Sequence, residues 1–330
     1  MKNFTIRLLF GALTCGSSYA ADIYNGTLVD AHSQKGKLIS VEQLSEKINK
    51  TDVDFTLLSF RLKPSKIRTE LLEIKQLTGN KVRYLIPTKL FKFNDKKANS
   101  SKVITRLRNF IKTTKQNDMD YVGFGEILVQ HAPHDHKKLK YDGINLDLNS
   151  KRISEAINIV LKDNKPVILH VELNDYETDS KTILNQLVTL SNKNPNNNFL
   201  LMHMAQIEFS EAEFIIKNTK NIHFMTSHAD NEMRLRMKKK KGQQGFINLF
   251  DKDDKLQKKW IDLMNENPKR FVFAIDNVYD NHWLRGYKKR VSMWRAALAS
   301  LEKQSSVLIA CGNANEYFKL GIECVSERPY

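Results

Sequence analysis

Apolar stretches of this sequence repeatedly end on a side chain that can bind a metal ion or move a proton. The residues at these ends are Asp30 with His32, Glu126, His170, His203 and Asp276. Neutral imidazole together with carboxylate suits Zn²⁺ or a similar divalent ion and leaves an open position for water. Such an ion lowers the pKa of its bound water to about 7 and polarises a carbonyl or phosphoryl oxygen, so we expect hydrolysis. A serine nucleophile is not favoured, because the sequence has no Gly-x-Ser-x-Gly turn.

The elements that must hold these residues alternate along the chain. Short apolar runs typical of strands are followed by longer amphipathic segments typical of helices. The expected strands are residues 27–32, 54–60, 82–88, 121–126, 166–170, 199–203, 222–227 and 270–276. The expected helices are residues 41–49, 65–77, 101–113, 150–162, 181–192, 210–217, 254–265 and 287–301. This α/β pattern predicts a single (β/α)8 TIM barrel over residues 21–330. A doubly wound open sheet is disfavoured, because no Gly-rich phosphate-binding turn follows an early strand.

In a TIM barrel the carboxyl ends of all strands meet on one face, which carries the active site. A single polar residue at a strand end is explained well enough by a hydrogen bond to the backbone. Here the pattern recurs on the first, fourth, fifth, sixth and eighth expected strands, which favours a shared site. Asp30 and His32 are two residues apart on one strand, so we expect both side chains on the same side of the sheet.

The same residues resemble the amidohydrolase superfamily, in its amidohydrolase-related branch of metal-dependent hydrolases. The resemblance rests on Asp30-Ala31-His32, His170, His203, residues 271–277 and the closing residues 312–320, and it spans nearly the whole chain. Residues 125–127, Gly-Glu-Ile, are also similar to the fourth-strand Gly-Glu motif of TatD-type metal-dependent nucleases.

This resemblance implies a role for each side chain. His32, His170 and Asp276 would ligate the metal, and Asp276 would also act as a general base toward the attacking water. His203 would hold or activate the reacting water or the substrate carbonyl. Glu126 would occupy the position where binuclear members place a bridging carboxylated Lys or a Glu, as a further ligand.

One position departs from the family pattern. Members usually open with His-x-His, whereas this sequence has Asp30 at the first of these two positions. A carboxylate can ligate Zn²⁺, so we expect Asp30 to complete the metal site with altered affinity. Some related lactonases work without a metal, so a metal-free site is the alternative.

Three further side chains are candidates for substrate binding. His131 lies in the segment after the fourth expected strand, and His228 follows the seventh. Trp283 follows the eighth strand and could form a wall of the substrate site, although packing is the competing role.

Composition and charge limit the classes of partner. The chain has 330 residues, and 41% of them are hydrophobic, which excludes wholesale disorder. A formal net charge of +16 favours anionic partners, but most lysines are scattered as on a solvated surface, and only residues 238–241 form a dense run. A small-molecule substrate is therefore favoured over nucleic acid.

The N-terminal residues 1–20 have the pattern of a signal peptide. Lys2 and Arg7 precede the apolar stretch 8–14, and Ser18-Tyr19-Ala20 supplies the small residues of a cleavage site. That stretch is far shorter than the roughly 20 residues that span a membrane. We therefore expect a periplasmic or secreted chain, in which Cys311 and Cys324 could pair.

These observations favour an exported metal-dependent hydrolase that cleaves an amide, ester or lactone bond of a small molecule. Two alternatives stay open: a TatD-like nuclease or phosphodiesterase, and a non-catalytic barrel that binds a ligand at a degenerate metal site. The sequence does not name the substrate, because loop residues set it and one fold serves many reactions.

Overall fold

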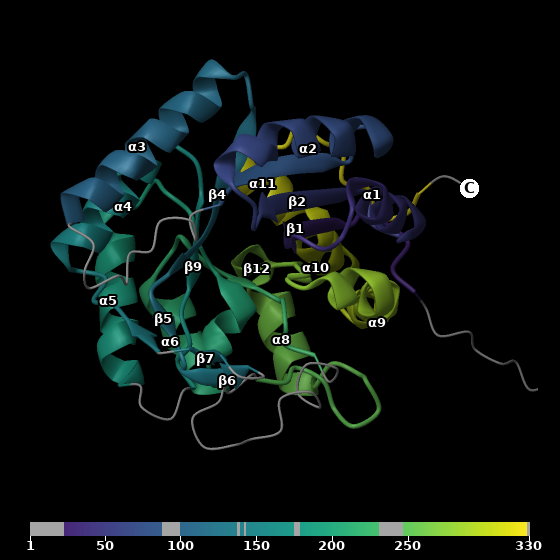
Figure 1. Cartoon of the computed structure of the whole chain (residues 1–330). Coiled ribbons are helices and arrows are strands. Elements are labelled where there is room, and N and C mark those ends of the chain that lie inside the picture. The colour runs from purple at the N-terminus through teal and green to yellow at the C-terminus, as the bar shows by residue number, and fades with distance from the viewer. Residues whose placement is uncertain are drawn as a thin grey trace, which may run out of the picture.

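The computed structural model describes residues 23–87, 100–136, 139–141, 143–174, 179–230 and 247–328. Eight parallel strands form one sheet whose spatial order follows the chain, β1-β2-β3-β4-β9-β10-β11-β12 (Figure 1). Their bounds are β1 Val29–Lys35, β2 Phe55–Phe60, β3 Val82–Ile86, β4 Tyr121–Leu128, β9 Val167–His170, β10 Phe199–Leu201, β11 Ile222–Met225 and β12 Phe271–Val272. A parallel sheet in chain order with a helix after most strands is the arrangement of a TIM barrel.

Backbone hydrogen bonds bring the first and last strands of this sheet together. The N–H of Ala31 in β1 donates to the carbonyl of Phe273 at 3.1 Å, and the N–H of Asp276 donates to the carbonyl of His32 at 2.8 Å. The expected (β/α)8 barrel is thereby confirmed. The expected signal peptide, residues 1–20, lies outside the described residues.

The helices surround the sheet, and three of them begin after a Ser or Asp whose side chain caps the helix. They are α1 Val41–Lys50, α2 Pro64–Leu77, α3 Ser100–Gln116, α4 Lys151–Leu161, α5 Ser180–Lys193, α6 Phe209–Asn218, α8 Lys258–Glu266, α9 Tyr287–Ala299, α10 Lys303–Val307 and α11 Asn313–Phe318. Ser40 begins α1 with a reciprocal capping box to Gln43, and Ser150 and Asp179 accept backbone hydrogen bonds at the starts of α4 and α5. None of the helices in the described ranges is long and apolar enough to cross a membrane.

The expected helix 254–265 begins later than its pattern indicated. The helix starts at Lys258, because the residues before it form a turn around the carboxylate of Asp251, which accepts the backbone N–H of Lys255 at 3.0 Å. Asp254 lies within this turn with a φ of +57° and does not cap the helix. An acidic residue that organises a turn has the same sequence signature as an N-cap.

Two short hairpins lie between β4 and α4 and were not expected from the sequence. β5 Gln130–His131 pairs antiparallel with β8 Ile144–Asn145, and β6 His134–His136 pairs with β7 Leu139–Tyr141. The β5–β8 hairpin carries His131. In Figure 1 the strands β5, β6 and β7 lie below the barrel, toward the opposite end from α11.

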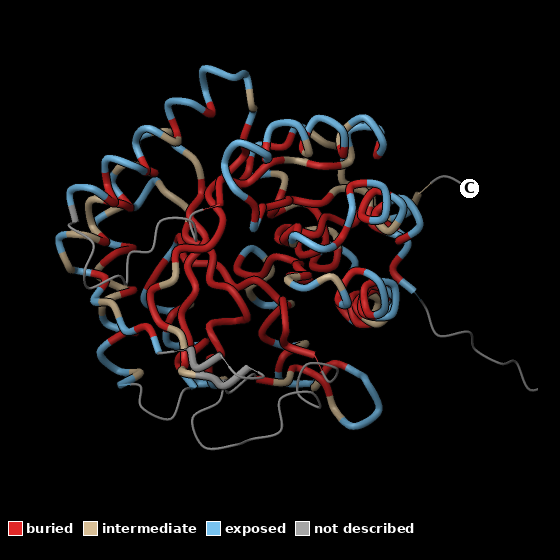
Figure 2. Tube along the Cα trace, in the orientation of Figure 1, coloured by how far each residue is buried: buried red, intermediate tan, exposed pale blue. Residues whose placement is uncertain are grey.

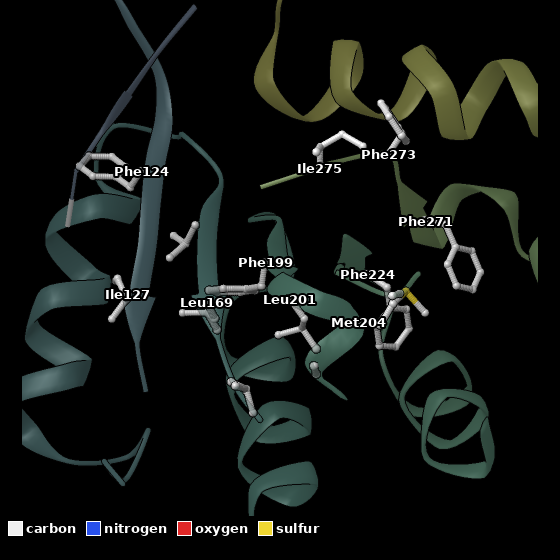
Figure 3. Close-up of a cluster of buried hydrophobic side chains, with 14 of the residues drawn as sticks. Phe124, Ile127, Leu169, Phe199, Leu201, Met204, Phe224, Phe271, Phe273 and Ile275 are labelled. Atoms are coloured by element: carbon white, nitrogen blue, oxygen red, sulfur yellow. The ribbon is translucent and has the colours of Figure 1, made fainter. Parts of the chain in front are cut away.

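Buried residues lie along the strands, whereas exposed residues lie on the surrounding helices and loops (Figure 2). The buried apolar side chains form two clusters, an outer layer outside the barrel wall and an inner layer inside it. Phe124, Leu169, Phe199 and Leu201 belong to the outer layer, which packs against the helices (Figure 3). Their strand neighbours, such as Ile168 and Leu200, belong to the inner layer, as the alternation of side chains along a strand requires.

Helix α11 closes one end of the barrel interior. Ala314 and Phe318 of α11 pack with inner-layer residues near the starts of the strands, including Val122 and Ile168. A Cβ at Gly123 would lie 2.9 Å from the Phe318 ring, so glycine permits this close approach. An apolar plug at this end leaves the carboxyl ends of the strands as the end available for polar chemistry.

Candidate functional site

Titratable side chains converge at the carboxyl ends of the strands. They are His32 on β1, Glu126 on β4, His170 on β9, and His203, His228 and Asp276 in the segments that follow β10, β11 and β12. All are at most 5% exposed. Within the described ranges their potential ligand atoms form overlapping groups with separations no greater than 4.8 Å: Glu126–His170–His203, His32–Glu126–Asp276 and His203–His228–Asp276.

A β-bulge in β1 decides which side chains of this strand reach the site. Asp30 pairs with Thr56 of β2, but Ser33 pairs with Leu58, so β1 carries one extra residue between them. An extra residue reverses the alternation of side chains beyond the bulge. His32 and Gln34 consequently face the other titratable side chains, while Asp30 lies before the reversal.

Asp30 does not join the metal-ligand groups found among the described residues. Its Oδ1 accepts the N–H of Ile275 at 2.9 Å, and its Oδ2 accepts the hydroxyls of Ser33 at 2.6 Å and of Tyr287 on α9 at 3.3 Å. Asp30 therefore points toward the helix layer. Burial raises its pKa to about 6, against the opposing effect of the bonds from Ser33 and Ile275. The structure thus corrects the expected Asp30–His32 ligand pair.

Gln34, and not Asp30, is the β1 residue that faces the site together with His32. Its Nε2 donates to Asp276 Oδ1 and to Glu126 Oε1, each at 2.9 Å. His32 Nδ1 lies 3.0 Å from the same Oδ1 of Asp276. Gln34 and His32, two residues apart on β1, therefore hold the carboxylate of Asp276 from two sides.

Asp276 is fully buried and ionised. Burial by itself would raise its pKa, but the hydrogen bond and charge of His32 and the charges of His228 and His203 hold the pKa well below its ordinary value. Its second oxygen, Oδ2, lies 3.6 Å from His203 Nε2 and 3.8 Å from His228 Nε2. Asp276 is therefore a charged acceptor surrounded by imidazoles.

His170 lies between two carboxylates. Its Nδ1 is 2.6 Å from Glu126 Oε2, and its Nε2 is 2.8 Å from Glu172 Oε1. Burial lowers the pKa of His170, but the charges and hydrogen bonds of the two glutamates outweigh burial and raise the pKa to about 9. Burial likewise opposes ionisation of Glu172, whereas its contacts with His170 and the charge of His131 lower its pKa to about 2.

His203 and His228 are stacked, neutral imidazoles. Their ring centroids are 4.3 Å apart at an interplanar angle of 3°. Burial lowers the pKa of His203 to about 4, with a further contribution from the charge of His170, and burial with the charge of His203 holds the pKa of His228 well below its usual value. A neutral imidazole is the form that can bind a metal ion.

The backbone turns into the left-handed region at three site residues. His203, His228 and Asp276 have φ values of 55°, 56° and 54°. Non-glycine residues rarely adopt this conformation, and such residues cluster at functional sites. The Oγ of Ser227 lies 3.2 Å from the N–H and 3.1 Å from Nδ1 of His203, which orients that ring.

The remaining sequence candidates lie at the edge of this cluster or behind it. The ring of His131 stacks on His170 with centroids 4.9 Å apart, and its Nε2 is 3.9 Å from Glu172 Oε1. Trp283 is 1% exposed, and its indole N–H donates to the carbonyl of Gln34 at 2.9 Å. In this structure Trp283 is a packing residue that fixes the end of β1, and it forms no exposed wall.

Three side chains of the site escaped the sequence analysis: Gln34, Glu172 and Ser227. Gln34 follows His32 by two residues and Glu172 follows His170 by two residues, so the period of a strand could have identified both. Ser227 adjoins His228 and has no such signal, because its contact with His203 depends on neighbouring strand ends.

The donor set at this site fits a divalent metal ion. His32 Nε2 is buried and has no hydrogen-bond partner among the described residues, which is costly unless the nitrogen has a ligand to bind. His32 also forms a group with Glu126 and Asp276, whose oxygens are suitable partners for the same ion. Imidazole and carboxylate together suit Zn²⁺ and related ions.

Comparisons with known proteins support the fold. No protein-family model matches the chain, and no curated protein matches its sequence. Among solved structures, the chain is similar to a probable 2-pyrone-4,6-dicarboxylic acid hydrolase from Acinetobacter baumannii with citric acid bound, at 12% identity and a TM-score of 0.51, over 89% of this chain and 100% of that chain.

Two further solved structures show the same architecture. One is an adenine deaminase, at 13% identity and a TM-score of 0.56, over 92% of this chain and 74% of that chain. The other is the phosphotriesterase homology protein from Escherichia coli with phosphate in its active site, at 10% identity and a TM-score of 0.54, over 90% and 99% of the two chains. These neighbours are members of the amidohydrolase superfamily, so the expected resemblance is confirmed at the level of fold. The TatD-like relationship stays a prediction.

Proposed function

We propose that this chain is an exported metal-dependent hydrolase that cleaves an amide, ester or lactone bond of a small molecule with an activated water. The observation that carries the proposal concerns His32. Its buried Nε2 has no hydrogen-bond partner among the described residues, and the residue forms a candidate metal-ligand group with Glu126 and Asp276. A hydrogen-bonded structural histidine would have both ring nitrogens satisfied. The fold shared with known hydrolases supports the same reaction class.

Two of the candidate metal-ligand groups in the described ranges share Glu126. His32, Glu126 and Asp276 form the first group, and Glu126, His170 and His203 form the second. A divalent ion bound there would supply a Lewis acid for the scissile carbonyl and lower the pKa of a coordinated water. Glu126 belongs to both groups, so its carboxylate would contribute to holding metal in either.

The chain's own side chains supply the proton transfer and the orientation. Asp276 Oδ1 is occupied by His32 and Gln34, whereas Oδ2 makes no hydrogen bond within the described ranges and is the oxygen that would accept a proton from the attacking water. His203 Nε2 lies 3.6 Å from Oδ2 and would orient the same water or the substrate carbonyl. Gln34 donates to both Asp276 and Glu126 and so fixes the positions of the two carboxylates relative to each other.

The test is turnover across a panel of esters, lactones, amides and phosphodiesters, with and without added Zn²⁺, Mn²⁺ or Co²⁺. We expect the wild-type chain to hydrolyse one or more small carbonyl compounds and Asp276→Asn to be inactive. Asp262→Asn is the matched control, because Asp262 lies on the exposed side of α8 and pairs only with Lys258 in the structure as described. Hydrolysis by Asp276→Asn at the wild-type rate would refute the proposal.

The two alternatives are separated by the same panel. Absence of metal, together with no turnover of any substrate in the panel, would favour a ligand-binding barrel. Turnover confined to phosphodiesters, with salt-dependent binding of DNA, would favour the nuclease. The basic run that could serve a nuclease, residues 238–241, lies outside the described residues.

Export is part of the proposal and rests on two observations. Residues 1–20 carry the pattern of a cleaved signal peptide. Cys311 and Cys324 form a disulfide, which is typical of chains that fold in an oxidising compartment. N-terminal sequencing of the mature protein should begin at Ala21. A mature chain that retains Met1 would contradict export by this route.

A further inference from the structure

Glu172 joins two parts of the molecule that are distant in sequence. It lies two residues after His170 at the end of β9 and is completely buried. Its Oε1 accepts from His170 Nε2 at 2.8 Å, and its Oε2 accepts the backbone N–H of Ala132 at 2.6 Å. One carboxylate therefore contacts both a candidate metal ligand and the segment that follows β5.

The two nitrogens of His170 face different partners. Nδ1 lies beside Glu126, with which His170 and His203 form a metal-ligand group. Nε2 lies on the opposite side of the ring, at Glu172. An imidazole that binds a metal through one nitrogen donates the other N–H, and a carboxylate acceptor fixes the ring orientation and increases its basicity. Glu172 occupies the position of that acceptor.

The β5–β8 hairpin is packed directly against this arrangement. The ring of His131 stacks on His170 at an interplanar angle of 21°, and its Nδ1 lies 2.7 Å from the carbonyl of Ala132. The N–H of the same residue, Ala132, is the donor to Glu172. A displacement of the hairpin would therefore remove a hydrogen bond from the carboxylate that orients His170.

We propose that Glu172 is a positioning residue that orients His170 for metal binding and couples occupancy of the metal site to the β5–β8 hairpin. This inference rests on the proposed function, because it assigns His170 to the metal site. Coupling of this kind is reciprocal: metal binding stabilises the hairpin contact, and an intact hairpin contact strengthens metal binding.

The first test compares Glu172→Gln and Glu172→Asp with the wild-type chain. The amide of Glu172→Gln can accept only one of the two N–H groups, so we expect its affinity for Zn²⁺, measured by competition with a chromophoric chelator, to fall by about 10–100-fold. The visible spectrum of the Co²⁺-loaded variant should shift, and Glu172→Asp should restore part of the affinity. The control is Asp163→Asn, which removes a part-buried carboxylate that contacts Lys115 and Tyr121 away from the site.

The second test uses the wild-type chain and is independent of how well the variants fold. Hydrogen exchange at the Ala132 amide should slow when Zn²⁺ is added, because its acceptor is held by a bound His170. Unchanged exchange, or wild-type affinity and spectrum in Glu172→Gln, would overturn the inference and leave the proposed hydrolase intact. A wild-type chain that takes up no metal would overturn both.

Discussion

The bulge in β1 predicts different effects on metal binding for a histidine introduced at position 34 and one introduced at position 30. If the bulge places His32 and Gln34 in the site, then Gln34→His creates the His-x-His pair that the resembling family usually has. The new imidazole would replace an amide whose Nε2 lies 2.9 Å from both Asp276 and Glu126. We expect the affinity for Zn²⁺ to rise by at least about tenfold, because the loss of an outer-shell partner alone changes affinity by about 10–100-fold.

Asp30→His should have the opposite outcome. Asp30 is fully buried, and its carboxylate accepts the N–H of Ile275. Replacing that carboxylate by an imidazole removes the acceptor of this N–H, which lowers the free energy of unfolding by about 1–3 kcal/mol. The larger ring also overpacks the space beside Tyr287, at about 1–3 kcal/mol. The summed loss of about 2–6 kcal/mol corresponds to a Tm lowered by on the order of 10 °C, with no gain in metal affinity.

The assay is chelator competition for Zn²⁺ together with thermal unfolding followed by circular dichroism. Asp30→Asn is the isosteric control, since its amide oxygen can still accept from Ile275. We expect it to retain wild-type metal affinity. If Asp30→His binds metal more tightly than the wild-type chain and Gln34→His does not, then Asp30 faces the site. The assignment of the bulge would then be wrong.

Three further predictions concern other parts of the molecule. Asp276→Asn should lose at least about 100-fold in turnover even at saturating metal, because a general base contributes about that much; full activity under excess metal would remove Asp276 from proton transfer. Burial, together with the charge of Arg270, lowers the pKa of His223 to about 3. In the unfolded chain the pKa of this histidine is about 6.5, so below that pH the unfolded state takes up a proton that the folded state does not. The free energy of unfolding should therefore be highest above pH 6.5 and fall by about 1.4 kcal/mol per pH unit as the pH drops toward 3. His223→Gln should flatten this part of the urea-unfolding profile, and an unchanged slope would contradict the assignment. Cys324→Ser opens a disulfide that joins residues 13 apart, so the free energy of unfolding should fall by about 3 kcal/mol, and an unchanged denaturant midpoint would count against the pairing.

The barrel could be predicted because each unit carries its own local signal. Apolar runs such as residues 199–203 alternate with amphipathic segments, and the expected helix 150–162 began at Ser150, which caps α4 in the structure. The clustering of His170, His203 and Asp276 followed from topology alone, since all strands of a parallel barrel end on the same face.

The parts that escaped prediction depend on contacts between distant segments. The alternation of side chains along a regular strand placed Asp30 on the same side as His32. The bulge between them arises from the pairing of β1 with β2, which no local sequence pattern indicates. The role of Glu172 depends on the N–H of Ala132, forty residues earlier, in a hairpin too short to have a strand signal. The helix expected from residue 254 begins at Lys258, because residues 251–255 form a turn that depends on the carboxylate of Asp251.

The central claim is that a divalent ion binds at His32, whose Nε2 has no hydrogen-bond partner in the described part of the chain. Elemental analysis tests this claim most directly. Wild-type protein and His32→Ala should be purified in parallel without chelator, and their metal content compared after dialysis against the same trace of Zn²⁺. We predict at least one ion per wild-type chain and a clear loss in His32→Ala, because the variant removes a ligand that also orients Asp276. Equal metal content in the two proteins, or none in either, would contradict the account.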